Sequence, residues 1–413
     1  MKKLLSFLVL LITTSLVFSQ DVINKINTIN SDSTDFSDLL FLEKILNGVQ
    51  IIALGEQLHY DGATFDAKVR MIKYLHEKLG YNVIAFESGL YDCTKANDLI
   101  ANRQDGNDTN YLNQAIFGMW NCNEVHRLAT YINETQKTSN PLILSGFDIQ
   151  FAGIIARDCL VKDFNQFIDY VEKISYQQLG IDTIQLNQSL ISLARYSNFF
   201  KKISNNDTLI LSSTIDTLLA TIDKTSVNNE YISYWKQVFI SIKADYRKKY
   251  LKDDAHSALR DSMMAENVEW LAKEKFKNQK IILWGANTHI ANSTQSVVHD
   301  YYCKNIIMGK DLKRKFGDLY YSVAFTSYGG RFFESWFPNS LVTKKPRKKS
   351  LETFLYQQEF DYSFMDLRKQ VHKNNPYFFN SKIFGNVPLK MNIYEIADGI
   401  FYINKMYPAT YKN

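Results

Sequence analysis

Two histidines and two glutamates follow short apolar runs in this sequence, and together they have the chemistry of an acid–base site. Glu56, His59, Glu87 and His289 each lie within five residues of the end of such a run. Imidazole titrates near neutral pH, and a nearby carboxylate makes it a stronger base. One Glu or His after an apolar run is usually structural, but recurrence at three runs favours a chemical role. The sequence has no G-x-S-x-G motif, so it does not support a serine nucleophile of the α/β-hydrolase type.

These apolar runs predict the buried strands that must position the polar residues. Residues 61–79 carry apolar side chains at helical spacing and end at Gly80, a typical helix C-cap. Strands that alternate with helices in this way predict βαβ units and a mainly parallel sheet. The predicted strands are residues 49–54, 83–86, 142–144, 281–284, 319–326 and 392–403. Open sheets of this type bind ligands beyond the carboxyl ends of their strands.

One long region interrupts the alternation of strands and helices. Residues 153–250 are polar-rich, helical in pattern and without a clear strand, and the strand pattern resumes after them. We expect one α/β domain over residues 21–413, with a mainly parallel central sheet flanked by helices. We further expect a helical subdomain inserted at about residues 153–250.

Several segments, in order along residues 45–410, resemble the erythromycin esterase family. Residues 51–59, IIALGEQLH, resemble the GExxH signature of that family, and residues 284–291, WGANTHIA, resemble its second histidine strand. The other similar segments are GYNVIAFES (80–88), Met119-Trp120, GFDIQ (146–150), RDSMMAENVEWL (260–271), MGKDLKRKFGDLYYSVAF (308–325) and DGIFYINKMYPAT (398–410).

The resemblance implies that the protein hydrolyses a carboxylic ester, such as a macrocyclic lactone, with water that His59 activates. Glu56 and Glu87 are then expected to orient the imidazole or share its proton. His289 and Arg260 are expected to stabilise the developing oxyanion. The residues implied to bind the substrate are Arg260, Tyr60, Asp148 and Trp120. The reaction would need neither a metal ion nor another cofactor.

The sequence departs from the family beside the candidate base. The family often has Thr-His-Gly where this chain has Leu58-His59-Tyr60, which changes the surroundings of the imidazole. Two other hypotheses stay open. Two histidines and two glutamates are also a plausible ligand set for a transition metal, which predicts a metal-dependent hydrolase of another substrate. A non-catalytic exported ligand-binding protein of the same fold would keep the fold without needing an acid–base pair.

The start of the chain resembles a secretory signal peptide. Lys2 and Lys3 precede a mostly apolar stretch over residues 4–18, and Ser19 offers a small residue before a cleavage site near Gln20 or Asp21. We therefore expect residues 1–20 to be removed and the mature protein to be secreted or periplasmic, without stable membrane anchoring. An uncleaved membrane anchor is the alternative.

The composition limits the classes of partner. The net charge of +5 is mild and its basic residues are dispersed, apart from a run at 344–349 that is typical of a solvated loop. We expect a small-molecule ester or lactone substrate and no nucleic acid. The four cysteines form no CxxC pair, and the sequence leaves their disulfide pairing and the oligomeric state open. They are Cys93, Cys122, Cys159 and Cys303.

Overall fold

The central feature of the computed structural model is a large sheet, most of whose strand pairs are parallel. The structure describes residues 23–103, 110–196, 203–248, 250–332, 341–369, 371 and 373–411. The expected signal peptide lies outside the described residues. The sheet has the strand order β1-β8-β11-β6-β2-β5-β3-β4, with β7 paired to β6. Its strands are β1 (Ile23–Ile26), β2 (Ile51–Leu54), β3 (Tyr81–Gly89), β4 (Ile143–Asp148), β5 (Lys280–Trp284), β6 (Tyr320–Phe332), β7 (Leu341–Val342), β8 (Tyr362–Asp366) and β11 (Gly399–Met406).

The pairing confirms the mainly parallel sheet and adds an antiparallel edge. All pairs from β11 through β6, β2, β5 and β3 to β4 are parallel, whereas β8 runs antiparallel to β11 and to β1. The sequence analysis did not predict β1 or β8. The strand predicted over residues 392–403 was wrong in its first half, because Ile393–Ile396 forms helix α16 and β11 begins at Gly399. A small separate sheet pairs β9 (Asn380–Ser381) with β10 (Leu389–Lys390).

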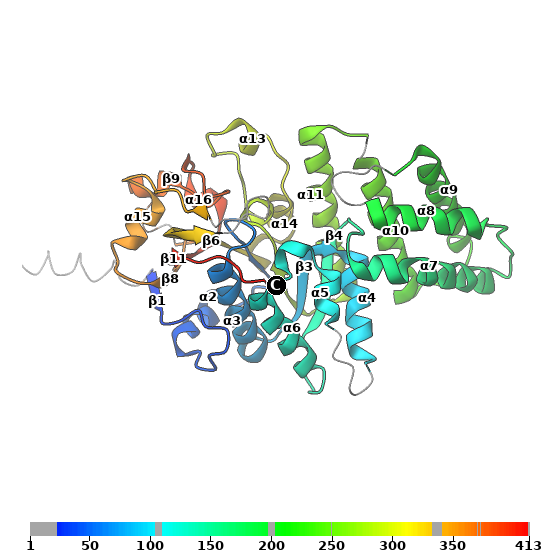
Figure 1. Ribbon diagram of the computed structural model, residues 1–413, viewed down its shortest axis with the longest axis horizontal. Helices are drawn as coiled ribbons and strands as arrows, with labels where there is room; N and C mark the ends of the chain where they lie inside the picture. Colours follow the sequence, from blue (N-terminus) through cyan, green and yellow to red (C-terminus); the bar gives the residue numbers. More distant parts are fainter. Residues whose placement is uncertain are drawn as a thin grey trace, which may run out of the picture.

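Helices cover both faces of the sheet because its strands carry apolar side chains on both sides. Ile52 and Leu54 of β2 pack in the cluster that includes residues of α3 and α6, whereas Ile51 and Ala53 pack with residues of α11 and α14. The helices of this main body are α2 (Phe41–Ile45), α3 (Gly62–Leu79), α4 (Leu90–Ala101), α5 (Tyr111–Ala115), α6 (Asn123–Thr135), α11 (Asp253–Trp270), α12 (Asn287–Ile290), α13 (Asp300–Cys303), α14 (Met308–Phe316), α15 (Leu351–Tyr356) and α16 (Figure 1). The short helical turns are η2 (Ser37–Leu39), η3 (Gly118–Trp120), η4 (Leu271–Lys275), η5 (Gly317–Leu319) and η6 (Pro376–Phe379).

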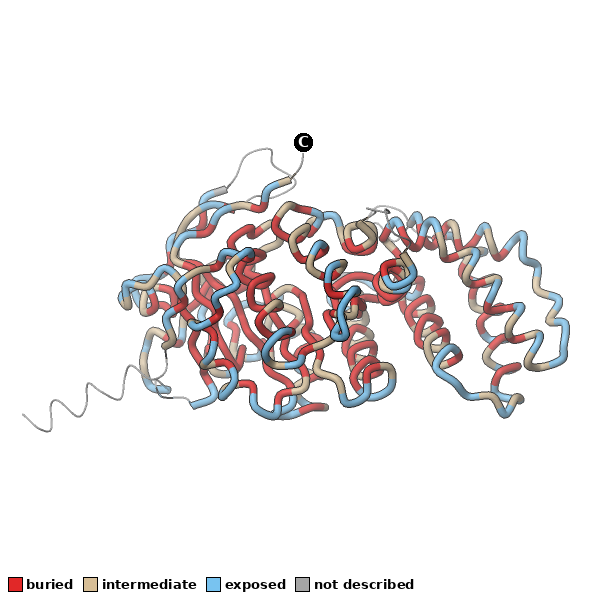
Figure 2. Tube along the Cα trace, turned by 90° about the horizontal axis from the view of Figure 1, so that it is seen from below, coloured by how far each residue is buried: buried red, intermediate tan, exposed pale blue. Residues whose placement is uncertain are grey.

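The region between β4 and α11 folds as a bundle of helices. It contains α7 (Ile154–Ser175), α8 (Thr183–Tyr196), α9 (Asn205–Ile222) and α10 (Glu230–Lys248). These helices project from the β4 end of the sheet and bury an apolar interior of their own (Figures 1 and 2). Tyr91 and Phe151 of the main body join that interior. The insertion is therefore packed onto the sheet domain through a shared apolar cluster.

Candidate active site

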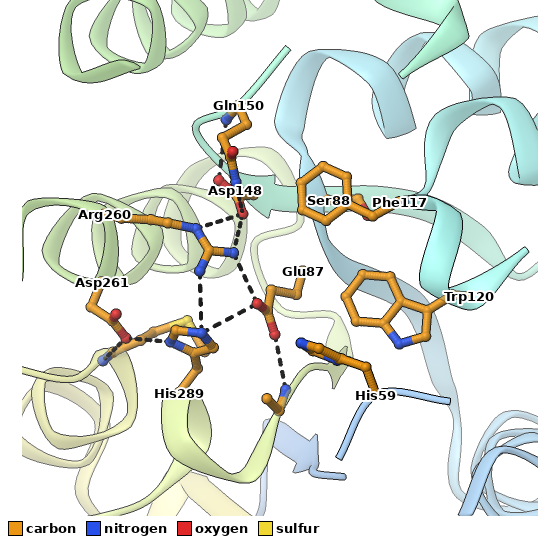
Figure 3. Close-up of polar contacts among 12 residues, drawn as sticks. His59, Glu87, Ser88, Phe117, Trp120, Asp148, Gln150, Arg260, Asp261 and His289 are labelled. Atoms are coloured by element: carbon orange, nitrogen blue, oxygen red, sulfur yellow. Dashed lines mark hydrogen bonds and ion pairs between the residues drawn. The ribbon is translucent and has the colours of Figure 1, made fainter. Parts of the chain in front are cut away.

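The strand order brings the polar strand ends onto one edge of the sheet. Strands β2, β5, β3 and β4 are consecutive and parallel, so their carboxyl ends lie side by side. Glu56 follows β2, Glu87 lies near the end of β3, Asp148 ends β4, and His289 follows β5. Figure 3 shows Glu87 between two imidazoles, with His59 on one side and His289 on the other.

The first imidazole forms a carboxylate–histidine dyad with Glu56. Nδ1 of His59 lies 2.7 Å from Oε1 of Glu56. The same carboxylate accepts hydrogen bonds from the indole N–H of Trp120, at 3.0 and 3.2 Å, and from the Lys68 ammonium, at 3.0 Å. The Glu56 side chain is fully buried, whereas that of His59 is 36% exposed. Trp120 and Lys68 thus hold the buried Glu56 carboxylate in place, while the imidazole of His59 is accessible to solvent.

The loop that carries His59 is held in an unusual backbone conformation by the end of the chain. Tyr60 has a φ of 72°, in the left-handed region that non-glycine residues rarely occupy. Its carbonyl accepts a hydrogen bond from the N–H of Ala409 at 2.8 Å. A Cβ at Gly62 would lie 2.5 Å from the carbonyl oxygen of Pro408, so only glycine permits this close approach. Residues 407–411 therefore help to fix the turn that presents His59.

The second imidazole forms a dyad with Asp261, on α11. Nδ1 of His289 lies 2.8 Å from Oδ1 of Asp261, and that oxygen also accepts the backbone N–H of Met308 at 2.9 Å. Nε2 of His289 lies 3.3 Å from Oε1 of Glu87. The His289 side chain is 18% exposed, half the value of His59. Both ring nitrogens of His289 therefore face carboxylates.

Arg260 links the carboxylates at the ends of β3 and β4. Its Nη2 lies 2.8 Å from Oε1 of Glu87, its Nε lies 2.9 Å from Oδ2 of Asp148, and Nη2 contacts the same Asp148 oxygen. The other Glu87 oxygen accepts the backbone N–H of Ala286 at 2.9 Å, which ties β3 to the turn before His289. These contacts hold the second imidazole within a buried network of charges (Figure 3).

The two imidazoles differ in the pKa values that their surroundings impose. Burial lowers the pKa of His59, but the hydrogen bond and charge of Glu56, together with the charge of Glu87, outweigh burial and raise it. Burial also opposes the charge of His289, yet Asp261 and Glu87 raise its pKa to about 9. Burial alone would raise the pKa of Glu87, but the His289 and Arg260 charges outweigh burial and lower it to about 2. A pKa of about 9 means that His289 is protonated at neutral pH.

The structure brings the four predicted catalytic residues to one edge of the sheet. The two glutamates, however, contact different imidazoles, which the sequence analysis did not expect. Glu56 and Glu87 were both expected to serve His59. In the structure only Glu56 bonds to that imidazole, while Glu87 contacts His289 and Arg260. The role of each residue in a reaction stays a prediction.

The residues predicted to bind substrate occupy varied positions. Arg260 and Asp148 are bonded to each other at the edge of the site. Trp120 is fully buried, and its indole N–H is directed at Glu56, which favours a positioning role. Tyr60 is half-buried, and its ring centre lies 6.0 Å from that of Tyr411. Contact of these side chains with a substrate stays a prediction.

Sequence reasoning missed two charged residues of the site, Asp261 and Lys68. Asp261 directly follows Arg260 on α11, and both side chains contact the same imidazole, that of His289. Lys68 lies on the apolar stripe of α3, three residues after Phe65 and four before Ile72. A lysine in such a stripe is the signal that indicates a buried partner.

Three further observations concern the described part of the chain. It contains no cluster of three or more His, Cys, Asp or Glu side chains arranged to hold a metal ion. None of its helices is both long and apolar enough to cross a membrane. The four cysteines are free thiols, with Cys93 and Cys122 buried.

The fold and site define an α/β protein with a charged, histidine-containing site at the carboxyl edge of a parallel sheet. The model of the erythromycin esterase family matches residues 76–383, which include Glu87, Asp148, Arg260 and His289. The chain belongs to this family of hydrolases.

Relatives match along nearly their whole length. The chain is 28% identical to YbfO of Bacillus subtilis, which carries a provisional name as a hydrolase, over 92% of this chain and 89% of YbfO. It is 22% identical to the type II erythromycin esterase of Escherichia coli, over 91% and 94% of the two chains.

Solved structures share the fold. A succinoglycan biosynthesis protein superposes with a TM-score of 0.71 at 19% identity, over 95% of this chain and 97% of the other. A mutant of the erythromycin esterase EreC in its open conformation superposes with a TM-score of 0.69 at 17% identity, over 94% and 98% of the two chains.

Proposed function

We propose that the protein hydrolyses a carboxylic ester or a macrocyclic lactone with water activated by His59. One observation carries this proposal: a partly exposed imidazole is bonded through Nδ1 to a fully buried carboxylate. Nε2 of His59 has no hydrogen-bond partner among the described residues, so it can accept a proton from water. Glu56 fixes the tautomer and stabilises the imidazolium that forms.

The second imidazole supplies the complementary charge. His289 is protonated at neutral pH and lies at the same edge of the sheet. A cation held in a water-poor site stabilises the oxyanion of a tetrahedral intermediate more than it stabilises the neutral ester. Arg260 has two carboxylate partners, so its main part is to hold Glu87 and Asp148 around His289.

Two other functions lead to different results in experiments. A metal-dependent hydrolase would need His289 or His59 as ligands, but both nitrogens of His289 already face protein groups. A non-catalytic ligand-binding protein would need no titrating base at the edge of the site.

The test is a panel of esters and lactones offered to the purified protein, with and without a chelator. We expect turnover that the chelator leaves unchanged, with an acid limb in kcat/KM where His59 takes up its proton. Activity that is lost with chelator and restored by a metal ion would favour the metal-dependent reaction. Ligand binding without turnover on any ester would favour the binding protein.

We also propose that the protein is exported after cleavage near residue 20. The charged start and apolar stretch of the sequence support this proposal. N-terminal sequencing of the protein from the source cells should find a chain that begins near Gln20 or Asp21. Intact Met1 in a membrane fraction would contradict it.

A further inference from the structure

Lys68 is a fully buried lysine directly behind the candidate base. It lies in the second turn of α3, and its side chain has no exposed surface. Its ammonium is 3.0 Å from Oε2 of Glu56 and 3.9 Å from the centre of the Trp284 ring. An ammonium with no access to water is costly unless a charge is paired with it. Glu56 is that partner.

The formal charges around the two dyads differ because of this lysine. The His289 network contains three carboxylates, Asp261, Glu87 and Asp148, against the single guanidinium of Arg260. An imidazolium reduces that buried excess of negative charge. Around His59, the bonded carboxylate of Glu56 already has the ammonium of Lys68 as its counter-ion. A neutral imidazole therefore leaves that ion pair balanced.

We propose that Lys68 is a positioning residue that neutralises Glu56 and thereby keeps His59 in the neutral form that accepts a proton. This inference rests on the proposed function of His59 as the base. The Lys68 side chain has no exposed surface, so it acts only through the carboxylate that it holds.

Other charged groups also face His59, but none of them replaces the neutralisation of Glu56 by Lys68. Glu87 on β3 raises the pKa of the imidazole, and the His289 charge on α12 lowers it. Burial raises the pKa of Asp61, at the start of α3, well above its usual range, so this carboxyl group adds less negative charge. Burial also lowers the pKa of Lys68 to about 8, so its ammonium remains protonated at neutral and acidic pH.

The direct test removes the Lys68 charge and measures the protonation of His59 without using turnover. Diethyl pyrocarbonate modifies neutral imidazole, so the pH midpoint of His59 modification, followed by peptide mass spectrometry, reports its pKa. In Lys68→Met the Glu56 charge is no longer balanced, so proton uptake by the Glu56–His59 pair becomes more favourable. We expect the midpoint to rise by roughly one pH unit, as for loss of a charge a few ångströms away.

Companion variants separate charge from shape. Lys68→Gln removes the charge but keeps a hydrogen-bond donor, so it provides a second neutral variant and should shift the midpoint in the same direction. Lys68→Arg keeps the charge and should stay near the wild-type midpoint. Glu56→Gln should lower the midpoint, and the Glu56→Gln/Lys68→Met double variant should fall between the two single variants.

A matched control removes an ammonium at the opposite edge of the sheet. Lys313 lies 2.9 Å from Asp398 and donates to the carbonyl of Tyr320, the first residue of β6. Lys313→Met should leave the His59 midpoint unchanged. A midpoint in Lys68→Met and Lys68→Gln that stays within 0.3 unit of wild type, roughly the smallest shift a charge this close allows, would overturn the proposal.

The same variants distinguish this inference from the proposed function. If His59 is the base, the acid limb of kcat/KM should move with the modification midpoint, and kcat/KM at pH 6 should fall by up to about tenfold. A shifted midpoint of His59 modification without turnover on any ester would support the electrostatic effect of Lys68 and contradict the assignment of His59 as the base. If the protein turns over esters and Lys68→Met leaves the pH of the acid limb unchanged, His59 remains the candidate base and the proposed effect of Lys68 is wrong.

Discussion

The Glu56–His59 and Asp261–His289 dyads use the same pair of functional groups, yet their surroundings prepare the two imidazoles for opposite tasks. In each dyad Nδ1 lies within 2.8 Å of a carboxylate oxygen. The difference lies in the second nitrogen and in the neighbouring charges. Nε2 of His289 faces Glu87, whereas the His59 side chain is partly exposed and its Glu56 partner is also bonded to Lys68.

A carboxylate–histidine contact therefore does not by itself define a base. Excess negative charge around His289 stabilises its proton, so it is suited to hold positive charge beside a developing oxyanion. A balanced ion pair behind His59 leaves its proton easier to exchange. Substitutions in the two dyads test this division of roles.

His59→Asn should abolish most of the turnover. It keeps a polar side chain of similar size but removes the titratable base, so kcat should fall by about 10²–10⁴, or roughly 3–5 kcal/mol of barrier. Turnover on an accepted ester, divided by the folded fraction, measures the effect. The control is His299→Asn, which changes an exposed residue before α13. If His59→Asn retains more than about a tenth of wild-type turnover, His59 is not the base and His289 becomes the candidate.

His289→Gln should lower kcat by about 10²–10³, the usual effect of removing one group that stabilises an oxyanion. Its acid limb should remain, because His59 still titrates. The full pH dependence of kcat/KM therefore decides the comparison. Disappearance of the acid limb in this variant would show that His289, and not His59, is the titrating base.

Trp120→Phe should reduce stability through the first dyad only. The change keeps an aromatic ring against Phe117 but removes the indole N–H from the Glu56 carboxylate. A hydrogen bond to a charged group contributes about 1.5–3 kcal/mol, so the free energy of unfolding in urea should fall by that amount. Trp270→Phe loses a bond to the neutral Ser233 hydroxyl and should cost less. Equal losses in the two variants would show that the bond to Glu56 contributes no more than a bond to a neutral group.

Asp261→Asn should have the smallest effect, visible only at alkaline pH. The Asp261 carboxylate helps to raise the pKa of His289 to about 9, so its removal lowers that pKa and the imidazole loses its proton at lower pH. The alkaline limb of kcat should therefore move to lower pH, with activity reduced up to about tenfold at pH 8 and little changed at pH 6. A loss that is uniform across pH would indicate a structural role for Asp261.

Much of the fold could be predicted from the sequence because strand and helix signals are local. Apolar runs that stop at Gly55, Glu87 and Gly285 predicted β2, β3 and β5, and helical spacing predicted α3 up to its cap at Gly80. The edge strand β1 was missed because its four residues, INKI, form too short a pattern within a polar stretch. Residues 393–396 were predicted as strand because their apolar side chains fit a buried run as well as a buried helical turn.

The titratable side chains, and their places at or just after the ends of buried strands, could be read from the sequence alone. The position of β5 between β2 and β3, and hence of Glu87 between His59 and His289, became apparent from the folded chain. So did the bonds of Asp261 to His289 and of Lys68 to Glu56. The physical reason is that strand order and charge pairing depend on contacts between residues far apart in the chain. No local pattern of side chains specifies those contacts.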